Sequence, residues 1–393
     1  MATTKTQVGI VGAGPAGLLL SHLLHLEGVE SVVLESRSRD YVEHRVRAGV
    51  LEHGVTELLA DCGVGARMRA EGLVHHGIEL RFDRTRHRMP LSDLAGGRAI
   101  TVYGQQEVVK DLIAARLEAG GAVHFGAECT GIDGSSPSSA SIAYRADGRD
   151  EVLECDMIAG CDGFHGVTRS AAPPGAIAAL EHTHPFAWLG ILASVAPSTD
   201  ELIYCRHERG FAMHSMRSHE VSRLYLQVGP EEDIEQWPDD RIWEELATRF
   251  VTDDGWSLAS GPVTEKGITA MKSFVVEPMQ WGRVFLAGDS AHIVPPTGAK
   301  GMNLAVADVR TLAAALVSWY RTGDESLLAS YSAECLRRVW RAQEFSTYMT
   351  TMLHPLAGDD FGAGLALSRL RYAVSSRAAA ESLAENYVDL SSL

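Results

Sequence analysis

Short apolar runs alternate with longer amphipathic stretches in the first part of the chain, a pattern typical of an α/β fold. Residues 7–28 (QVGIVGAGPAGLLLSHLLHLEG) are predicted to form a strand, a glycine turn and a helix that stops at a glycine. Residues 31–35 (SVVLE) predict a second buried strand that ends on an acid. Residues 104–121 predict an amphipathic helix closed by glycines, and residues 156–163 (DMIAGCDG) predict another strand ending in Asp-Gly.

The pattern changes near residue 175. The following runs are short, and residues 222–228 (SRLYLQV) alternate between apolar and polar, which predicts an antiparallel sheet. Residues 239–251 predict a capped helix, and beyond residue 283 the first pattern returns with a strand, a glycine turn and long helices at 301–320 and 326–352. We therefore predict one discontinuous nucleotide-binding domain at 1–175 and 270–350, a β-rich domain at 176–269 and a C-terminal helical segment at 351–393.

Composition narrows the classes of protein that this pattern allows. The chain has 393 residues, enough for two or three lobes, and its net charge of −16 argues against nucleic acid and anionic membrane surfaces as partners. No apolar run approaches the roughly 18 residues of a membrane span, and the polar start MATTKTQ is unlike a signal peptide. Six cysteines without a CxxC pair, and no histidine cluster, predict a reduced, soluble, cytoplasmic protein without a metal site.

A dinucleotide fingerprint lies at the first glycine turn. Gly12, Gly14 and Gly17 follow the GxGxxG spacing between a predicted strand and helix, and Glu35 ends the next strand. The first glycine permits the tight turn, the second lets the backbone approach a pyrophosphate, and the third lets helix and strand pack closely. Glu35 would accept hydrogen bonds from a ribose and would oppose a 2′-phosphate, so the expected ligand is FAD or NAD rather than NADP.

Two further strand ends favour FAD over NAD. Asp162 and Asp289 each follow an apolar strand, and the segment 288–303 (GDSAHIVPPTGAKGMN) makes a long Gly/Pro turn before a helix. Asp289 would accept a hydrogen bond from a ribityl hydroxyl, and the N–H groups at the start of the 301–320 helix would face a ring that carries developing negative charge. On these residues alone, an ordinary strand–turn–helix remains the alternative.

The motifs GAGPAG, CDGFHGVTR and GDSAH…P together resemble the single-component FAD-dependent aromatic hydroxylases, and within them the branch that acts on 4-hydroxybenzoate. Other similar stretches follow in the same order over nearly the whole chain, at residues 45–54, 101–108, 185–193, 201–213, 273–280 and 385–388. The resemblance implies a Rossmann-like FAD-binding domain of the GR2 type, an inserted, mainly antiparallel β substrate domain and C-terminal helices near an interface. It also implies a homodimer.

The resemblance implies hydroxylation of 4-hydroxybenzoate at its 3-position to 3,4-dihydroxybenzoate, with O2, NADH or NADPH and a flavin C4a-hydroperoxide. FAD would contact residues from four parts of the chain. These are Gly12, Gly14, Ala16, Gly17 and Glu35 at the adenosine half, Arg45, Arg47, Ala48, Gly49, Val50 and Gln105 near the phosphates, Asp162 and Asp289 at strand ends, and Met302 and Asn303 along the isoalloxazine.

The resemblance also implies how the substrate is held. Arg217 would bind the carboxylate, because a guanidinium matches a carboxylate with two hydrogen bonds. Tyr204 would bond to the phenol and Tyr387 would continue the proton relay, since a phenol must become phenolate-like before its ring attacks an electrophilic oxygen. The remaining implied contacts are Ser215, Met216 and Tyr225 near the carboxylate, the Pro296 carbonyl at the phenol, and His75 as the link to solvent.

Several alternatives stay open. Taken alone, Arg217 has a simpler interpretation as a solvated arginine, Tyr204 as a core aromatic and His75 as a surface histidine. Residues 81–88 (RFDRTRHR) predict either a patch that steers anions or, more simply, a solvated basic face. Ser36, Arg37 and Arg39 after the ribose acid leave the choice between NADH and NADPH open, with a slight lean to NADH or dual use. The substrate could be another phenolic acid, and the protein could be a flavin-binding sensor without turnover.

Overall fold

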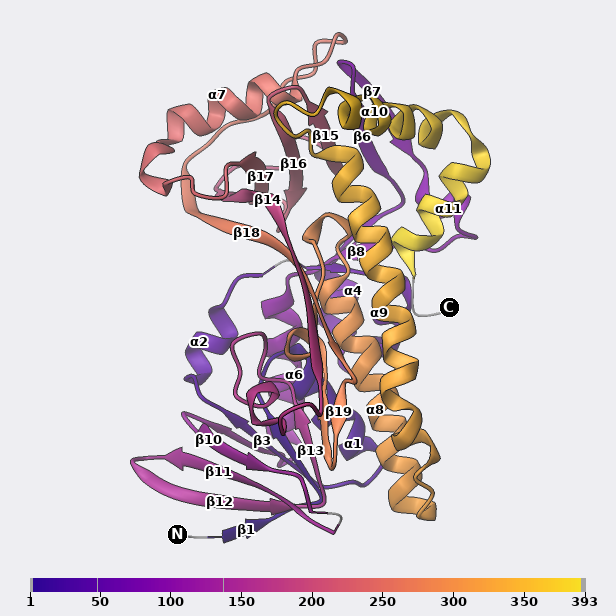
Figure 1. The fold of residues 1–393 in the computed structure, drawn as a ribbon. Coiled ribbons are helices and arrows are strands. Elements are labelled where there is room, and N and C mark those ends of the chain that lie inside the picture. Colours follow the sequence, from indigo (N-terminus) through magenta and orange to yellow (C-terminus); the bar gives the residue numbers. More distant parts are fainter. Residues whose placement is uncertain (1–2, 48, 137, 390–393) are drawn as a thin grey trace.

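The computed structural model describes residues 3–47, 49–136 and 138–389 and consists of two lobes joined by long strands (Figure 1). The lower lobe in Figure 1 contains a six-stranded sheet of order β19–β20–β13–β2–β3–β9, parallel except for β19. This sheet joins strands from both outer pieces of the chain. Its strands are β2 (Val8–Val11), β3 (Ser31–Glu35), β9 (Ala122–Phe125), β13 (Met157–Gly160), β19 (Gln280–Trp281) and β20 (Val284–Leu286).

Helices and a second sheet enclose this parallel sheet. Helix α1 (Pro15–Leu26) packs against α6 (Gln105–Glu118) and α8 (Gly301–Thr322), and α8 packs against α9 (Ser326–Leu353). A Cβ on Gly9 of β2 would lie 2.7 Å from Ile142 Cδ1, so the four-stranded sheet β1–β12–β11–β10 packs closely on β2. Its strands are β1 (Thr3–Lys5), β10 (Glu128–Asp133), β11 (Ala140–Ala146) and β12 (Arg149–Cys155).

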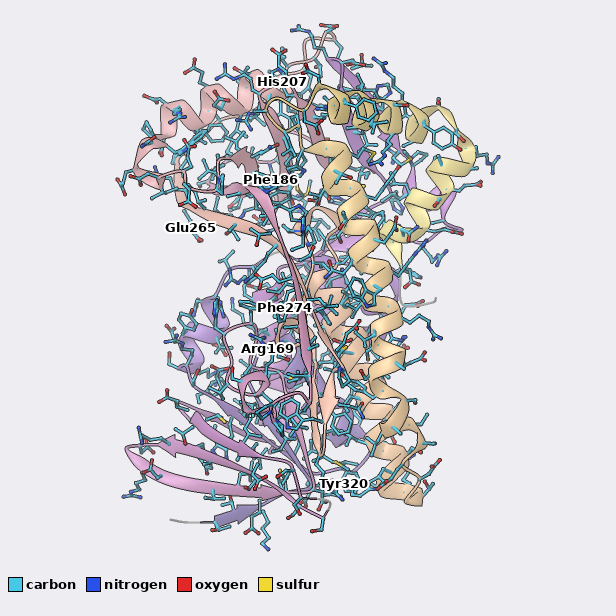
Figure 2. All side chains as sticks on the ribbon, viewed as in Figure 1. Arg169, Phe186, His207, Glu265, Phe274 and Tyr320 are labelled. Carbon is cyan, nitrogen blue, oxygen red and sulfur yellow. The ribbon has the colours of Figure 1, made fainter. Side chains whose placement is uncertain are left out.

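An eight-stranded sheet of order β21–β18–β14–β17–β16–β15–β6–β7 forms the upper lobe and reaches into the lower one. Strands β14 and β18 pair along most of their length, and Phe186 and Phe274 mark their upper and lower parts in Figure 2. All neighbours are antiparallel except β15 and β6. The strands are β6 (Ile78–Phe82), β7 (Thr85–Met89), β14 (Ala178–Ala193), β15 (Leu202–His207), β16 (Gly210–Met216), β17 (Ser222–Val228), β18 (Val263–Glu277) and β21 (His292–Ile293).

The two faces of this large sheet bury different clusters. One face packs against α7 (Asp239–Phe250) through residues such as Ile203 and Leu226. The other face joins a cluster that includes Tyr204, the end of α9, α10 (Asp360–Ser375) and α11 (Arg377–Val388). Because side chains alternate along a strand, central strands such as β14 and β15 contribute to both clusters.

Smaller elements complete the fold. Strands β4 (Val50–Leu51) and β5 (Leu73–His75) pair with the two sides of β8 (Ile100–Val102). The remaining helices are α2 (Arg39–His44), α3 (His53–Asp61), α4 (Ala66–Glu71) and α5 (Leu91–Leu94), with 3-10 turns η1 (Arg169–Ala171), η2 (Ile234–Gln236), η3 (Gly288–Ser290) and η4 (Pro296–Gly298).

The predicted mixed α/β fold is confirmed, and the helices expected at 104–121, 239–251, 301–320 and 326–352 are present as α6, α7, α8 and α9. The agreement between predicted and observed helices does not bear on the predicted domain boundaries, which stay a prediction. The hairpin of β6 and β7 lies in the first predicted domain by sequence but pairs with β15 of the large sheet, because β6 continues that sheet in parallel. Among the described residues, no helix has the length and apolarity to cross a membrane.

Candidate active site

The first glycine turn forms a cradle with open space on one side. Gly12 has φ +101, and a Cβ there would lie 2.4 Å from Cys161 O. A Cβ on Gly17 would lie 2.0 Å from Gly12 O, so only glycine fits where α1 meets the turn. A Cβ on Gly14 would meet no atom within 4 Å. The three positions therefore differ as the fingerprint predicts, with open space at the glycine expected to face a pyrophosphate.

The start of helix α1 is built to receive negative charge. Gly14 is the N-cap and gives no side-chain cap, and Pro15 occupies the first turn. The first N–H groups of a helix have no partners within the helix, and together with the helix dipole they favour an anion. Glu35 fixes the turn, since its Oε2 accepts the Ala13 N–H at 2.8 Å. These features fit the adenosine and pyrophosphate portions of FAD.

A second turn, η3, lies beside the glycine cradle. Gly288 has φ +65, and a Cβ there would be 3.7 Å from the Cβ of Ala16 on α1. The next residue, Asp289, is exposed to solvent, yet enough protein atoms surround it for desolvation to affect its pKa. Burial raises the pKa of Asp289, while His292 and the guanidinium groups of Arg47 and Arg45 lower it. Asp289 is therefore an exposed carboxylate close enough to both arginines for them to affect its pKa, which is compatible with a ribityl-binding acid.

The predicted phosphate-side segment is held by backbone contacts. Gly49 O accepts the Tyr103 N–H at 2.8 Å, and a Cβ on Gly49 would lie 2.3 Å from Tyr103 O. Val50 pairs with Val102 on β8, which places Gln105 at the start of α6 near the same segment. Ala48, also predicted to contact the cofactor, lies outside the described residues.

Three further residues were predicted to contact the cofactor, namely Asp162, Asn303 and Met302. Asp162 Oδ2 accepts two hydrogen bonds from Thr168, at 2.8 Å from its N–H and 2.7 Å from Oγ1, whereas its Oδ1 is buried without a partner. The Asn303 amide donates to Val50 O at 3.0 Å and to Ala299 O at 2.8 Å. The Asn303 side chain is thus committed to the protein, and it would approach a flavin ring through its backbone. Met302 is half-buried beside it.

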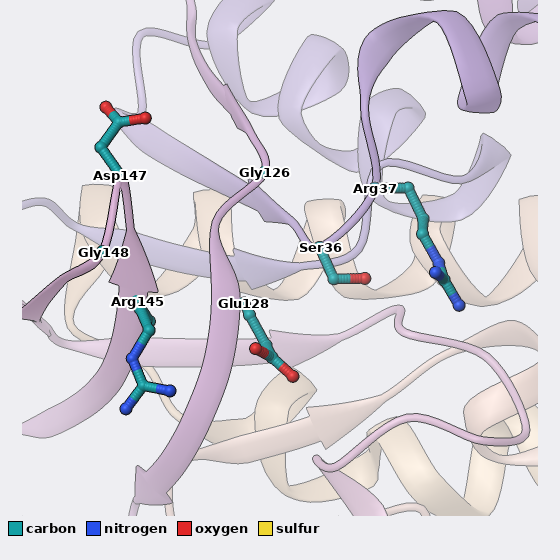
Figure 3. A pocket seen from close by; sticks show the side chains of 7 residues that line it. All are labelled: Ser36, Arg37, Gly126, Glu128, Arg145, Asp147 and Gly148. Atoms are coloured by element: carbon teal, nitrogen blue, oxygen red, sulfur yellow. The ribbon is translucent and has the colours of Figure 1, made fainter.

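A polar pocket opens beside the end of β3 (Figure 3). It has a volume of about 450 Å³, and its charged residues are Arg37, Glu128, Arg145 and Asp147, with Ser36 between them. Arg145 Nε donates to Asp150 at 3.0 Å, so one of the two cations that line the pocket is already paired. Charges of both signs line the pocket, and it therefore does not decide between NADH and NADPH.

The inner face of the large sheet carries the predicted substrate residues. Strand register aligns Gly190, Tyr225, Met213 and Tyr204 across β14, β17, β16 and β15. Residues in such a row point to the same face. Ser215 is two residues from Met213 and therefore shares that face. The sequence did not single out Met213, and only the register places it between the two tyrosines.

Arg217 lies at one end of this row and has a buried N–H group that could donate a hydrogen bond. Its Nη1 donates to Met216 O at 3.1 Å, and its buried Nε has no partner. Burial lowers the pKa of Arg217, the neighbouring Tyr225 raises it, and Arg223 lowers it further. The Ser215 hydroxyl makes only a long 3.5 Å contact with Met216 O. A carboxylate would satisfy the guanidinium N–H, and both the predicted contacts Ser215 and Tyr225 are close to it.

Two buried tyrosines meet at the other end of the row. The Tyr204 and Tyr387 hydroxyls are 2.5 Å apart, and the side chains are 0% and 2% exposed. Burial raises the pKa of both phenols above the ordinary value of 10. Tyr387 is also held by its backbone, because Lys300 Nζ donates to Tyr387 O at 3.0 Å and pairs with Glu52 at 2.7 Å. The sequence pattern does not predict Lys300 or Glu52, because a buried pair 248 residues apart leaves no local signal.

The last two predicted site residues have weaker support. His75 is 1% exposed, and neither ring nitrogen has a hydrogen-bond partner. Burial lowers its pKa to about 4. His75 is therefore not the surface histidine of the simpler interpretation, but no hydrogen bond joins it to Tyr387 within the described residues. Pro296 O accepts the Ala299 N–H at 2.9 Å and keeps a second lone pair for a ligand.

The basic run at 81–88 is largely exposed, but its arginines are all paired with carboxylates, and Arg81 is buried. The segment is therefore a solvated face whose positive charges are compensated, with no free basic patch to steer anions. The pairs are Arg81 and Arg86 with Glu79, Arg84 with Asp253, Arg86 with Asp254, and Arg88 with Glu201.

Comparison with known proteins agrees with this geometry. A family described as "FAD binding domain" matches residues 5–346. The p-hydroxybenzoate hydroxylase of Acinetobacter baylyi is 46% identical over 391 residues, which cover 99% of this chain and 96% of that protein. A 3-(3-hydroxy-phenyl)propionate/3-hydroxycinnamic acid hydroxylase of Mycobacterium sp. is 25% identical, covering 90% of this chain and 61% of that protein.

Solved structures support the same fold. The p-nitrophenol 4-monooxygenase from Pseudomonas putida superposes with a TM-score of 0.87 over 100% of this chain and 99% of that chain, at 19% identity. At this identity the likeness concerns the fold alone. The family match and the 46% identity carry the assignment, which includes bound FAD and the use of NAD(P)H and O2. The chain therefore belongs to the FAD-dependent aromatic hydroxylases of the p-hydroxybenzoate hydroxylase type.

Proposed function

We propose that this protein hydroxylates 4-hydroxybenzoate at the 3-position and releases 3,4-dihydroxybenzoate. The observation that carries the proposal is that one face of the sheet presents Arg217, whose buried Nε has no partner, and Tyr204, whose hydroxyl meets that of Tyr387 on α11. Tyr225 and Tyr204 lie two strands apart, or about 10 Å between backbones. A benzene ring with its carboxylate and hydroxyl at opposite ends fits between such groups.

The residues of the chain have separate tasks in this reaction. Arg217, with Ser215 and Tyr225, would hold the carboxylate and fix the direction of the ring. Tyr204 would accept the phenol proton as its own proton passes to Tyr387 and the Tyr387 proton leaves toward solvent, which leaves the phenol oxygen more negative. The ring carbon beside that oxygen then becomes the nucleophile. FAD, when bound, supplies hydride acceptance from the nicotinamide and activation of O2, and the surrounding protein excludes water.

The FAD-binding residues are proposed on the same terms. The glycine cradle with Glu35 would bind the adenosine and pyrophosphate, and Asp289 would bind the ribityl chain. Asp162 has an unpartnered buried oxygen for the same ligand. Arg45 and Arg47 would lie near the phosphates, while Asn303 would contribute backbone rather than side-chain contacts.

One measurement tests the reaction directly. Oxygen uptake by the purified flavoprotein is followed with NADH and separately with NADPH, with and without 4-hydroxybenzoate, while 3,4-dihydroxybenzoate and H2O2 are assayed. Product equal to oxygen consumed supports the proposal and identifies the reductant. Stimulated uptake that yields mainly H2O2 would mean that another phenolic acid is the substrate. No NAD(P)H consumption with any phenolic acid would favour the flavin-binding sensor.

The flexible Met213 side chain favours the alternative function, in which another phenolic acid is the substrate. Met213 lies in the row between Tyr225 and Tyr204, where it would contact the ring, and methionine adapts to more than one shape. A binding titration with the 2-, 3- and 4-hydroxybenzoates separates the candidates. Tight binding of the 4-isomer alone supports the first substrate, because only its carboxylate and hydroxyl lie opposite each other.

We also propose that the protein is a cytoplasmic homodimer. Helix α10 exposes apolar side chains on one face, with Phe361 80%, Leu365 47% and Tyr372 59% exposed. Their spacing of four and seven residues places them on one stripe, as an interface helix requires. All six cysteines are buried and unpaired, as expected in a reducing compartment. Light scattering of wild type and Phe361→Asp tests the dimer, and a wild-type monomer would remove it.

A further inference from the structure

A buried ion pair lies directly behind the turn that carries Asp289. His292 Nε2 is 2.6 Å from Asp308 Oδ2, and both side chains are 1% exposed. Because a carboxylate only accepts hydrogen bonds, His292 donates through its Nε2–H. His292 is on β21 and Asp308 is on α8, so the pair ties the strand after the turn to the helix beside it.

Asp308 also fixes the turn itself. The Oδ2 atom that accepts from His292 accepts the backbone N–H of Gly288 at 2.9 Å. Gly288 is in the left-handed region with φ +65, and Asp289 is the next residue. The direction in which the Asp289 carboxylate points therefore depends on a backbone N–H that Asp308 holds. Replacing Asp308 would release both Gly288 and His292 at once.

The charges around the pair favour a protonated His292. Burial disfavours the imidazolium, but the carboxylates of Asp308 and Asp289 outweigh it and raise the pKa of His292. Among the other titratable groups facing the pair, Cys161, just after β13, and Tyr331 and Cys335 on α9 have pKa values raised by burial, so they are neutral at ordinary pH. An imidazolium then offsets the Asp308 charge behind the turn that carries Asp289.

We propose that His292 and Asp308 are positioning residues for FAD, which fix the Gly288–Asp289 turn while the imidazolium offsets the buried Asp308 charge behind it. This inference rests on the proposed role of Asp289 toward the ribityl chain. It concerns FAD retention and is independent of the proposed phenolic substrate, so the two proposals fail separately.

The first test measures how tightly the holoenzyme keeps FAD. The FAD-loaded protein is diluted in series, and released flavin is followed by its fluorescence. Asp308→Asn should raise the dissociation constant about tenfold or more, because a charge-assisted hydrogen bond is lost. Asp156→Asn is the matched control, since Asp156 Oδ2 accepts from Tyr320 at 3.0 Å near the base of the lower lobe (Figure 2). Its dissociation constant should stay within about twofold.

The second test distinguishes positioning of FAD from a general structural role. The wild-type dissociation constant should rise as the pH passes the pKa of His292, which Asp308 and Asp289 raise above the ordinary imidazole value, because His292 then loses its proton. His292→Gln keeps a donor but has no charge, so its FAD affinity should be lower near neutral pH and lack this rise. The proposal is overturned if Asp308→Asn retains FAD as tightly as Asp156→Asn. It is equally overturned if His292→Gln keeps the wild-type pH profile, which decides the matter should Asp308→Asn fail to fold.

Discussion

Replacing Tyr387 by phenylalanine removes one hydroxyl from the buried pair and leaves the ring in place. The hydroxyl lies 2.5 Å from that of Tyr204, which is 0% exposed and cannot turn to bulk water. Loss of a buried hydrogen-bond partner costs about 1–3 kcal/mol of folding free energy. Loss of a positioned proton-transfer group costs roughly 10²–10⁴ in rate. We therefore expect hydroxylation to fall by about a hundredfold, which corresponds to about 2.7 kcal/mol of activation free energy.

The assay separates the two half-reactions. Anaerobic reduction of the bound flavin by NADH or NADPH is followed by flavin absorbance, and it should stay within about threefold of wild type because no step of phenol activation is involved. With oxygen present, the yield of 3,4-dihydroxybenzoate per NAD(P)H should fall and H2O2 should rise. Burial raises the pKa of both tyrosines above 10, so the wild-type rate should not follow a tyrosine ionisation between about pH 6 and 9.

Tyr320→Phe provides the matched control. Its hydroxyl donates to Gln7 O at 2.9 Å and to Asp156 at 3.0 Å, close to the base of the lower lobe in Figure 2. The same atom is removed, with a similar loss of stability, but product yield should not change. Unchanged rate and yield in Tyr387→Phe would refute the relay. An equal loss of hydroxylation in Tyr320→Phe would show that the effect comes from stability.

Three other predictions follow from the same geometry. Arg217→Gln should weaken 4-hydroxybenzoate binding by about 10²–10³-fold, since a buried carboxylate loses its cation, and FAD retention should be unchanged. If a substrate titration of the flavoprotein gives the wild-type dissociation constant, Arg217 does not belong to the site. Gly14→Ala should leave thermal stability near that of wild type but release FAD, because its Cβ meets open space in the protein; full retention of FAD would contradict the cradle. His75 should stay neutral in an NMR titration down to about pH 5, because burial lowers its pKa to about 4; its neutral form stabilises the fold fully above pH 6.5, and this contribution is lost as pH falls toward 4. An NMR midpoint near 6.5 would contradict its burial.

The glycine cradle could be predicted because its logic is local. Gly12, Gly14, Gly17 and Glu35 lie within 24 positions of one another, and each has a distinct steric task that spacing alone expresses. In the structure, a Cβ on Gly12 would lie 2.4 Å from Cys161 O and a Cβ on Gly17 would lie 2.0 Å from Gly12 O. A Cβ on Gly14 would meet open space. The open side at Gly14 is visible only in three dimensions, yet the pattern had already required it.

The substrate face depends on register, which the alternating pattern leaves undetermined. A one-residue slip of β16 would turn Met213 and Ser215 away from Tyr204. Residue periodicity alone could not choose between these registers, and the family resemblance supplied Tyr204, Arg217 and Tyr387. Met213 was missed because it resembles any core methionine until the strands are aligned.

Charge pairs between distant positions were the hardest feature to predict. Lys300 and Glu52 form a pair across 248 positions, and the arginines at 81–88 find carboxylates that lie up to 169 positions away. A charged residue looks the same in sequence whether water or a partner surrounds it, and packing decides between them. Asn303 shows the converse, because the motif predicts its place but not that its amide is already committed to Val50 and Ala299.

The segment 288–303 connects the proposed flavin site to the proposed proton relay. It carries Asp289 at one end and Lys300 near the other, and Lys300 holds the backbone of Tyr387. Helix α9 pins the middle, since Thr297 and Thr350 hydroxyls are 2.9 Å apart. A shift of this segment would therefore move the ribityl acid and the relay tyrosine together, whereas Arg217 belongs to the sheet and would stay in place. In the proposed site, the carboxylate end of the substrate would thus be anchored independently of the flavin, while the phenol end would be coupled to it, which suits a reaction that begins at the phenol.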